Sequence, residues 1–292
     1  MIRLEPECIA CLTRQHLGKD LSGLSKQEQI EYLQTVLAVI AGADRSHPAP
    51  VVVHAINSAL KERFGIDSDF AHVKPHFNRL ILDREAEFAA RLARAEEPLR
   101  LALQYAMIGN YIDFGARYEV KEEELSRLIE TAGEQPLPEE TYRALVRELE
   151  EAERLVFLTD NCGEIVFDKQ LISLIRSRYP KLEITVIVRG GPVSNDASME
   201  DARQVGLTDL VRVIGNGNTI AGTWQQALSP EAREAMDRAD LILSKGQANF
   251  ETLRGCGRNI YYLFLCKCQM FARKFGVPRF TGMLVNDSAC RE

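Results

Sequence analysis

The sequence has no long hydrophobic run. Its longest apolar stretches, such as Ile260–Cys266, are far shorter than the roughly 20 residues that a membrane-spanning helix needs. The first residues, MIRLEPECIACLTRQHL, carry acidic side chains and lack the apolar core of about 7–15 residues found in a signal peptide. No internal repeat and no low-complexity segment is present, which excludes a solenoid. We therefore expect no membrane partner and no secretion.

The sequence lacks an even number of cysteines: it has seven among 292 residues. An odd count excludes complete pairing into disulfides, and a chain of this length can bury enough apolar surface to fold without them. Reduced thiols are typical of the cytoplasm, which is the expected compartment. The 36 basic and 42 acidic side chains give a net charge of −6, which argues against a nucleic-acid partner. No feature indicates an oligomeric state.

Residues 1–152 show mostly helical patterns. Ser25 is a suitable N-cap for a helix whose apolar residues recur every three to four positions, and Gly42 would end it. Similar patterns predict helices over 48–64, 73–92, 99–108, 122–129 and 138–152. These observations predict an all-helical N-terminal domain over residues 1–152.

From residue 153 onward, short apolar runs alternate with helical patterns. The runs predict strands at 155–159, 184–188, 210–214, 241–244 and 260–265, and helices at 165–178, 199–205, 231–239 and 266–275. Strands that alternate with helices indicate a mostly parallel sheet with helices on both faces. The sequence thus predicts an α/β fold, in which residues 153–292 form a three-layer α/β/α domain.

The residues that follow these strands are the best candidates for chemistry, because ligands of open parallel sheets bind beyond the carboxyl ends of the strands. Asp160, Asn161 and Asp196 offer hard oxygen ligands that suit Mg²⁺ or Mn²⁺. Gly163 permits a sharp turn into the next helix, whose N-terminus could bind an anion. The alternative for this segment is an ordinary turn or helix cap.

Two cations follow the same strands. Lys245 supplies a point charge for phosphate oxygens, and Arg189 could bind them in a bidentate manner. A divalent metal, cations and a helix N-terminus together are suited to phosphoryl transfer, because charge grows on the phosphoryl oxygens. The combination of these residues at three strand ends favours metal-assisted phosphate chemistry.

Several segments resemble one family. Five segments are similar to the signatures of the damage-control phosphatases, once catalogued as domain of unknown function eighty-nine: LTDNCGEIVFD, VRGGPVSNDASMEDA, LSKGQANFE, GNYIDFG and LVND. The N-terminal CIAC and the late Lys267-Cys268 resemble its mainly prokaryotic branch. The resemblance spans nearly the whole chain.

The resemblance implies a helical region beside a Rossmann-like domain, and a metal-dependent phosphatase that hydrolyses small phosphorylated metabolites. It implies Mg²⁺ or Mn²⁺, with Co²⁺ or Ni²⁺ as further candidates. By the matching motifs, the expected metal ligands are Asp160, Asn161 and Asp196. The expected catalytic residues are Asp160, Lys245 and Glu164, with Lys245 as a phosphate contact. The expected substrate-binding residues are Arg189, Asn110, Asp113, Gly163, Asn249 and Glu251.

Some alternatives stay open. Asp160 could be a covalent nucleophile, or a water molecule could attack directly. Cys8 and Cys11 could form a second metal site with Cys268, or they could be simple core thiols. Phe70, Lys74 and Asn78 could line the mouth of the pocket. For the whole protein, the alternatives are a carboxyl methyltransferase that uses S-adenosylmethionine and a non-enzymatic metal-binding protein based on its cysteines.

Overall fold

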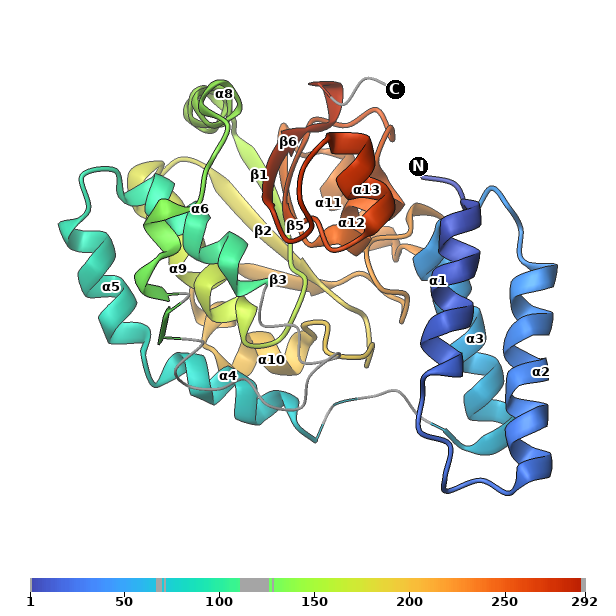
Figure 1. Ribbon diagram of the computed structural model, residues 1–292. Helices are drawn as coiled ribbons and strands as arrows, with labels where there is room; N and C mark the ends of the chain where they lie inside the picture. Colours follow the sequence, from blue (N-terminus) through green and yellow to red (C-terminus); the bar gives the residue numbers. More distant parts are fainter. Residues whose placement is uncertain (1, 67–69, 71, 111–125, 128, 290–292) are drawn as a thin grey trace.

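The computed structural model describes residues 2–66, 70, 72–110, 126–127 and 129–289 (Figure 1). Helices precede the first strand throughout the N-terminal half, and strands alternate with helices after it. The α-helices are α1 (Pro6–Leu17), α2 (Lys26–Gly42), α3 (Ala49–Phe64), α4 (Lys74–Leu82), α5 (Glu85–Arg94), α6 (Pro98–Gly109), α8 (Glu139–Glu151), α9 (Glu164–Arg178), α10 (Met199–Gln204), α11 (Pro230–Asp237), α12 (Gln247–Leu253) and α13 (Gln269–Phe275). The strands are β1 (Arg154–Leu158), β2 (Glu183–Val188), β3 (Arg212–Gly215), β4 (Leu241–Lys245), β5 (Ile260–Leu265) and β6 (Gly282–Asn286).

The strands form one six-stranded sheet in the order β3-β2-β1-β4-β5-β6. The first five are parallel, as the sequence predicted, and β6 runs antiparallel to β5. This is the strand order of the Rossmann fold, in which the sequence order reverses direction beside β1. The predicted α/β class with a Rossmann-like, mostly parallel sheet is therefore confirmed. The sequence did not predict β6, a short strand at the edge of the sheet.

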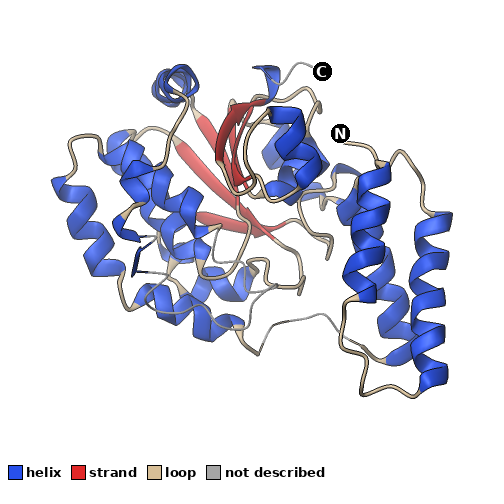
Figure 2. Ribbon diagram, viewed as in Figure 1, coloured by secondary structure: helices blue, strands red, loops and turns tan. Residues whose placement is uncertain are grey.

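Helices cover both faces of the sheet (Figure 2). Side chains alternate along each strand, so that Leu155 and Phe157 of β1 face one hydrophobic cluster while Val156 and Leu158 face the other. The first cluster lies under α4, α5, α6, α8, α9 and α10, and the second lies under α11, α12 and α13. The three layers form around buried strands, which is why their sequences are continuously apolar.

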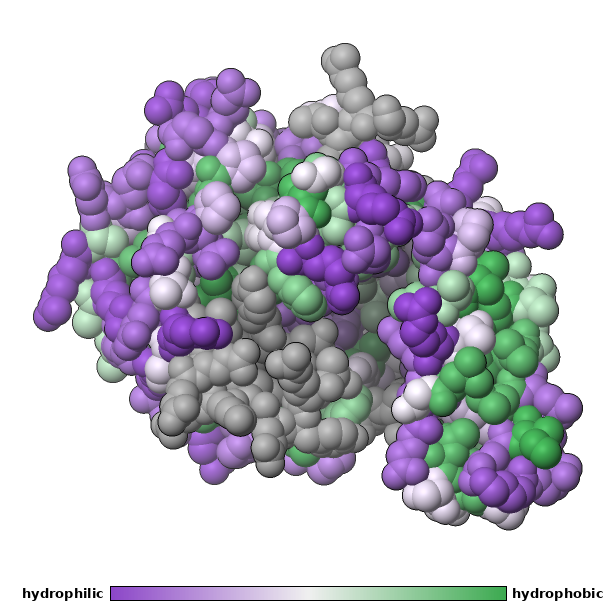
Figure 3. All heavy atoms as spheres, in the orientation of Figure 1, coloured by the Kyte–Doolittle hydropathy of each residue, from purple (hydrophilic) through white to green (hydrophobic). Residues whose placement is uncertain are grey.

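Helices α1, α2 and α3 form a bundle with its own hydrophobic cluster, which includes Tyr32, Val36 and Ile56. Ser25 caps α2 in a capping box with Glu28, as its position predicts. The bundle stands beside the side of the sheet that carries α12 and α13 (Figure 1). Apolar side chains gather over α1 and α2 on the face shown in Figure 3. Ile9 of α1 and Leu37 of α2 are exposed.

The helices differ from the predicted ones in two places. The pattern over 73–92 predicted one helix, but the chain turns at Asp83 and Arg84 and forms α4 and α5. This turn brings Phe88 against Phe167 of α9, with ring centroids 4.8 Å apart. Helix α12, directly after β4, was not predicted. The helix predicted over 122–129 lies largely outside the described residues.

The change from helices to alternating elements falls at β1, next to the predicted boundary at residue 152. Helices α4, α5, α6 and α8 nevertheless share one hydrophobic core with the sheet, whereas α1, α2 and α3 have a core of their own. A division into two domains at residue 152 stays a prediction. In the part of the chain that the structure describes, no helix has the length and apolar character needed to cross a membrane.

Candidate active site

The segments after β1 and β2 lie side by side at the carboxyl edge of the sheet. Asn161 and Asp196 form an isolated antiparallel bridge. The backbone N–H of Cys162 donates to the carbonyl of Asn195 over 2.8 Å, and that of Ala197 donates to the carbonyl of Asp160 over 2.7 Å. The structure therefore brings together Asp160, Asn161 and Asp196, the three predicted metal ligands, and buries all three.

Asp160 lies at the centre of this cluster. Its Oδ2 accepts hydrogen bonds of 2.8 Å from the amide groups of Asn110 and Asn161. Burial, together with the nearby carboxylates of Glu164 and Asp196, raises the pKa of Asp160 to about 8 against the opposing charges of Arg189 and Lys267. Several buried acids at one place create a strong demand for positive charge.

Gly246 closes the site from the side of β4. Its backbone has φ 82° and ψ 156°, a conformation that is almost restricted to glycine. A Cβ atom at this position would overlap the carboxylate of Asp160. The absence of a side chain at Gly246 therefore makes the space that Asp160 occupies.

A second group of buried charges surrounds Lys245 and shares Glu164 with the cluster at Asp160. Lys245, the last residue of β4, donates to the carbonyl of Ala106 over 2.8 Å, to Glu164 Oε1 over 2.5 Å and to Asp168 Oδ1 over 2.7 Å. Burial alone would lower the pKa of Lys245, but the carboxylates of Asp168 and Glu164 outweigh this and raise it. An ammonium group has three N–H donors, so all of them have acceptors within the protein. Direct contact between Lys245 and a phosphate stays a prediction.

Glu164 is held from both sides. Lys245 binds its Oε1, while its Oε2 accepts from Asn110 over 3.1 Å and from Asn161 over 2.9 Å. Asp168, one turn further along α9, was not among the predicted site residues. Its position four residues after Glu164 places both carboxylates on one helix face, which is the signal in the sequence.

Arg189 extends from the end of β2 and is 1% exposed. Its Nε donates to Asp196 Oδ2 over 2.6 Å, and its Nη2 lies 3.7 Å from Asp160 Oδ1. Within the described residues, neither Nη1 nor Nη2 has a hydrogen-bond acceptor. Since a buried guanidinium rarely leaves its donors unsatisfied, these two nitrogens point to an anionic ligand.

Two residues of α4 hold the segments in place. Lys74 Nζ donates to the carbonyl of Asp196 over 2.7 Å and pairs with Asp201 over 2.8 Å. Asn78 Oδ1 accepts from the backbone N–H of Gly163 over 2.6 Å. Gly163 itself has φ 70° and directly precedes α9, as its predicted role at the turn requires. Sequence reasoning placed Lys74 and Asn78 only at the mouth of the pocket.

The remaining predicted residues lie in different places. Asn110 joins the site, whereas Asp113 lies outside the described residues. Asn249 donates to the carbonyls of Thr159 and Lys245 over 3.0 Å and 2.7 Å and so ties β1 to β4. Glu251 lies near the N-terminus of the chain, where its carbonyl accepts from the N–H of Ile2 over 3.2 Å.

The predicted second metal site involves the start of α1 and the start of α13. Ion pairs between Glu7 and Arg273 and between Glu5 and Lys274 join these two helices. Cys11 is exposed, and Cys268 precedes α13. Among the described residues, no group of three histidine, cysteine, aspartate or glutamate side chains could hold a metal ion. A cysteine metal site stays a prediction.

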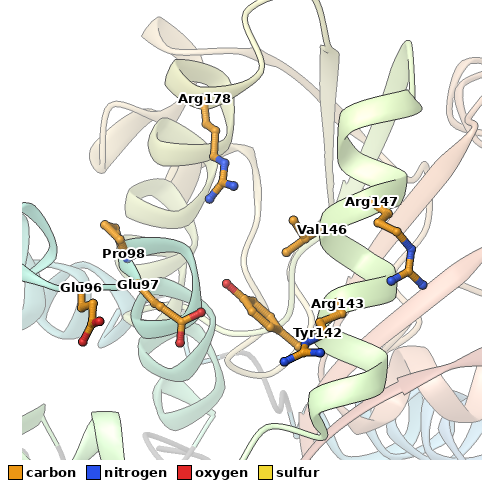
Figure 4. A pocket seen from close by; sticks show the side chains of 8 residues that line it. All are labelled: Glu96, Glu97, Pro98, Tyr142, Arg143, Val146, Arg147 and Arg178. Atoms are coloured by element: carbon orange, nitrogen blue, oxygen red, sulfur yellow. The ribbon is translucent and has the colours of Figure 1, made fainter.

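Two cavities differ in their relation to this site. One of about 350 Å³ adjoins the strand ends and is lined by Lys74, Pro75, Arg189, Gly190, Gly191, Pro192, Ser198, Met199, Glu200, Asp201 and Gln204. The other, of about 450 Å³, lies at the opposite ends of α6 and α9, where Tyr142 and Arg178 face it (Figure 4). Only the first contacts a site residue, Arg189.

The donor set at the strand ends fits a hard divalent cation. Asp160, Asn161 and Asp196 provide oxygen atoms only, which suits Mg²⁺ or Mn²⁺ better than softer metals. The space left by Gly246 and the crowding of buried carboxylates are both consistent with a cation at Asp160.

Comparisons with known proteins agree on one family. The sequence model described as the damage-control phosphatase ARMT1-like domain matches residues 4–282. The chain belongs to this family. A protein of Archaeoglobus fulgidus named damage-control phosphatase is 33% identical over 291 residues, which cover 94% of this chain and 96% of the relative.

Pyrococcus horikoshii provides a second relative, named damage-control phosphatase PH1575. It is 30% identical over 282 residues, which cover 95% of this chain and 96% of the relative. The crystal structure of the same protein, described as a DUF89 family protein, superimposes with a TM-score of 0.81 and 26% identity over 98% of this chain and 100% of that one. The family resemblance seen in the sequence is therefore confirmed.

Proposed function

We propose that this protein is a metal-dependent phosphomonoesterase that hydrolyses small phosphorylated metabolites. Its relatives carry the name damage-control phosphatase. The observation that carries the proposal is the pair of Nη groups of Arg189, which have no acceptor in the described part of the chain, beside three buried oxygen-ligand residues and a cavity of about 350 Å³. The family does not favour a methyltransferase or a cysteine-based metal carrier.

Asp160, Asn161 and Asp196 would hold Mg²⁺ or Mn²⁺, with Co²⁺ or Ni²⁺ as alternatives. When bound, such an ion supplies positive charge against the phosphoryl oxygens and lowers the pKa of bound water. Hydrolysis adds water across the bond between phosphorus and the ester oxygen, which yields an alcohol and inorganic phosphate.

In the proposed reaction, Arg189 binds the phosphoryl group, and other side chains orient the metal ligands. Arg189 would donate from Nη1 and Nη2 to the phosphoryl oxygens, where charge grows during the reaction. Its Nε bond to Asp196 fixes the guanidinium and leaves these two nitrogens for the ligand. Glu164 and Asn110 orient Asp160 and Asn161 through the amide hydrogen bonds, and Lys245 holds Glu164.

The cavity would receive the part of the substrate that leaves as the alcohol. Its wall includes Ser198, Glu200 and Gln204, whose polar groups suit a hydrophilic leaving group. We place the protein in the cytoplasm, since the six cysteines that the structure describes are all unpaired.

The test is phosphate release from a panel of small phosphate esters with Mg²⁺, Mn²⁺, Co²⁺ or Ni²⁺. We expect a chelator to abolish release. Asp196→Asn should reduce kcat/KM at least about 100-fold, because it removes a ligand and the partner of Arg189. Asp209→Asn, on an exposed carboxylate, should leave the rate unchanged. Full metal-dependent activity in Asp196→Asn would contradict the proposal.

A further inference from the structure

The orientation of Arg189 decides where a phosphate can bind. Its Nη1 and Nη2 have no hydrogen-bond acceptor among the residues that the structure describes, and its Nε donates to Asp196. The bond to Asp196 holds the side chain at its outer end only. The side chain starts from the backbone at the end of β2, so this backbone must be fixed as well if the two Nη groups are to meet a ligand at one place.

The backbone of Arg189 is held on both sides. Its own N–H donates to the carbonyl of Ala197 over 2.9 Å. The N–H of Gly190 donates to Asn216 Oδ1 over 2.7 Å and to the carbonyl of Asn218 over 3.1 Å. This N–H belongs to the same planar peptide group as the carbonyl of Arg189. The bond to Asn216 therefore fixes the ψ angle of Arg189, which relates its side chain to the segment that follows the strand.

Asn216 is a rigid support for this peptide group. It directly follows β3 and is completely buried. Its backbone N–H donates to the carbonyl of Val188 over 2.8 Å, and its carbonyl accepts from the N–H of Ser229 over 2.9 Å. Its Oδ1 also accepts from the N–H of Asn218 over 3.1 Å, and its Nδ2 donates to the carbonyl of Gly222 over 3.4 Å. Because every polar group of Asn216 has a partner, its side chain cannot turn away without the loss of buried hydrogen bonds.

Gly190 lets the segment after β2 and the loop after β3 approach each other. A Cβ atom at this position would lie 2.5 Å from the backbone nitrogens of Gly217 and Asn218, so the two segments are in direct backbone contact. The loop is held in turn by helix α3, where His54 Nδ1 donates to the carbonyl of Thr219 over 2.9 Å. The support for the end of β2 therefore extends through the loop to the helical bundle.

We propose that Asn216 is a positioning residue of the phosphate site: its amide oxygen fixes the peptide group after Arg189 and so directs Nη1 and Nη2 at the phosphoryl oxygens. The inference rests on the proposed phosphatase function. Asn216 does not touch the substrate and acts through Arg189. The guanidinium then has two supports, Asp196 at its outer end and Asn216 at its backbone.

The experiment measures the affinity for inorganic phosphate in the presence of saturating Mg²⁺, by calorimetry and by inhibition of phosphate-ester hydrolysis. Asn216→Ala removes the acceptor, Arg189→Gln removes the group on which it acts, and the double variant completes a double-mutant cycle. The matched control is Asn218→Ala, which removes an amide of the same loop that bonds to the backbone of Ala227 and Ile220. Thermal unfolding checks that each variant is folded. Asn216→Ser, which shortens the acceptor, replaces Asn216→Ala in the cycle if that variant does not fold.

We expect Asn216→Ala to weaken phosphate binding about fivefold, as the loss of one buried hydrogen bond implies. Asn218→Ala should stay within about twofold of the unaltered protein. In the Arg189→Gln background, Asn216→Ala should change the affinity by less than about twofold, because the group that it positions is gone. A residue that only stabilises the fold would have its full effect in both backgrounds. Independent effects, an unchanged affinity in Asn216→Ala, or an equal or greater loss in Asn218→Ala would overturn the inference.

The two proposals fail in different ways. If the unaltered protein hydrolyses phosphate esters but the effects of Asn216→Ala and Arg189→Gln are independent, the inference alone is wrong. If Arg189→Gln binds phosphate as tightly as the unaltered protein does, Arg189 is not the phosphate contact, and the inference is wrong whatever the hydrolytic activity. If the unaltered protein releases no phosphate from any ester with any of the four metals, the proposed function fails and the inference fails with it.

Discussion

Replacement of Gly246 by alanine tests how the site is built, because one added methyl group would enter the space of the Asp160 carboxylate. The backbone at Gly246 has φ 82° and ψ 156°, which costs a residue with a Cβ about 1–3 kcal/mol. Overpacking of a buried site costs about 1–3 kcal/mol more. We therefore expect Gly246→Ala to lower the free energy of unfolding by roughly 2–6 kcal/mol.

The same change should damage ligand binding. Asp160 can avoid the methyl group only if it leaves the position set by Asn110 and Asn161. Metal affinity should then fall at least about tenfold, the lower range for a disturbed ligand environment. Urea denaturation measures the first effect, and titration calorimetry with Mn²⁺ measures the second.

Gly257 provides the matched control. It has φ 81°, close to that of Gly246, but a Cβ there would meet no atom within 4 Å. Gly257→Ala should therefore show the backbone cost alone, about 1–2 kcal/mol, with unchanged Mn²⁺ affinity. The reasoning is refuted if Gly246→Ala binds Mn²⁺ as tightly as Gly257→Ala does.

Two further expectations concern the buried carboxylates. Burial, with Glu164 and Asp196, raises the pKa of Asp160 to about 8, so protons compete with the metal below that pH. Calorimetry should show metal affinity rising by up to about tenfold per pH unit towards pH 8 and levelling off above it, and an affinity independent of pH between 6 and 8 would contradict this. Burial also raises the pKa of Asp168 from 3.8 to about 7. The folded metal-free protein then keeps a proton that the unfolded chain releases, and its stability falls as the pH rises from about 4 to about 7. Asp168→Asn should make this fall shallower in urea denaturation, and an unchanged slope would show that Asp168 does not titrate in this range.

The sequence predicted the residues that follow the strands better than the residues that support them. Asp160, Asn161 and Asp196 follow β1 and β2, and the carboxyl ends of parallel strands must meet at one edge. The alternation of strands and helices is therefore enough to predict that these three residues lie close together. The same reasoning located Arg189, whose two Nη groups lack acceptors among the residues that the structure describes.

The partners of Lys245 depend on packing that no local pattern specifies. The carbonyl of Ala106 reaches Lys245 only because α6 packs along α9. The bond between Lys74 and the carbonyl of Asp196 likewise needs α4 in place beside α10. Strand β6 was missed because its short segment after α13 pairs antiparallel to β5 and so does not continue the pattern of parallel strands. In each case, the deciding contact joins residues far apart in the sequence.

The Asn110 bridge has a consequence for how the protein folds. Two of its side-chain hydrogen bonds connect it with residues 50 and 155 positions away along the chain. Closure of such long loops is slow, because entropy must be lost before the contacts form. The site should therefore appear only in the last cooperative step, after α6 has docked onto the complete sheet. A fragment that begins at β1 would carry every predicted metal ligand and still lack a formed site.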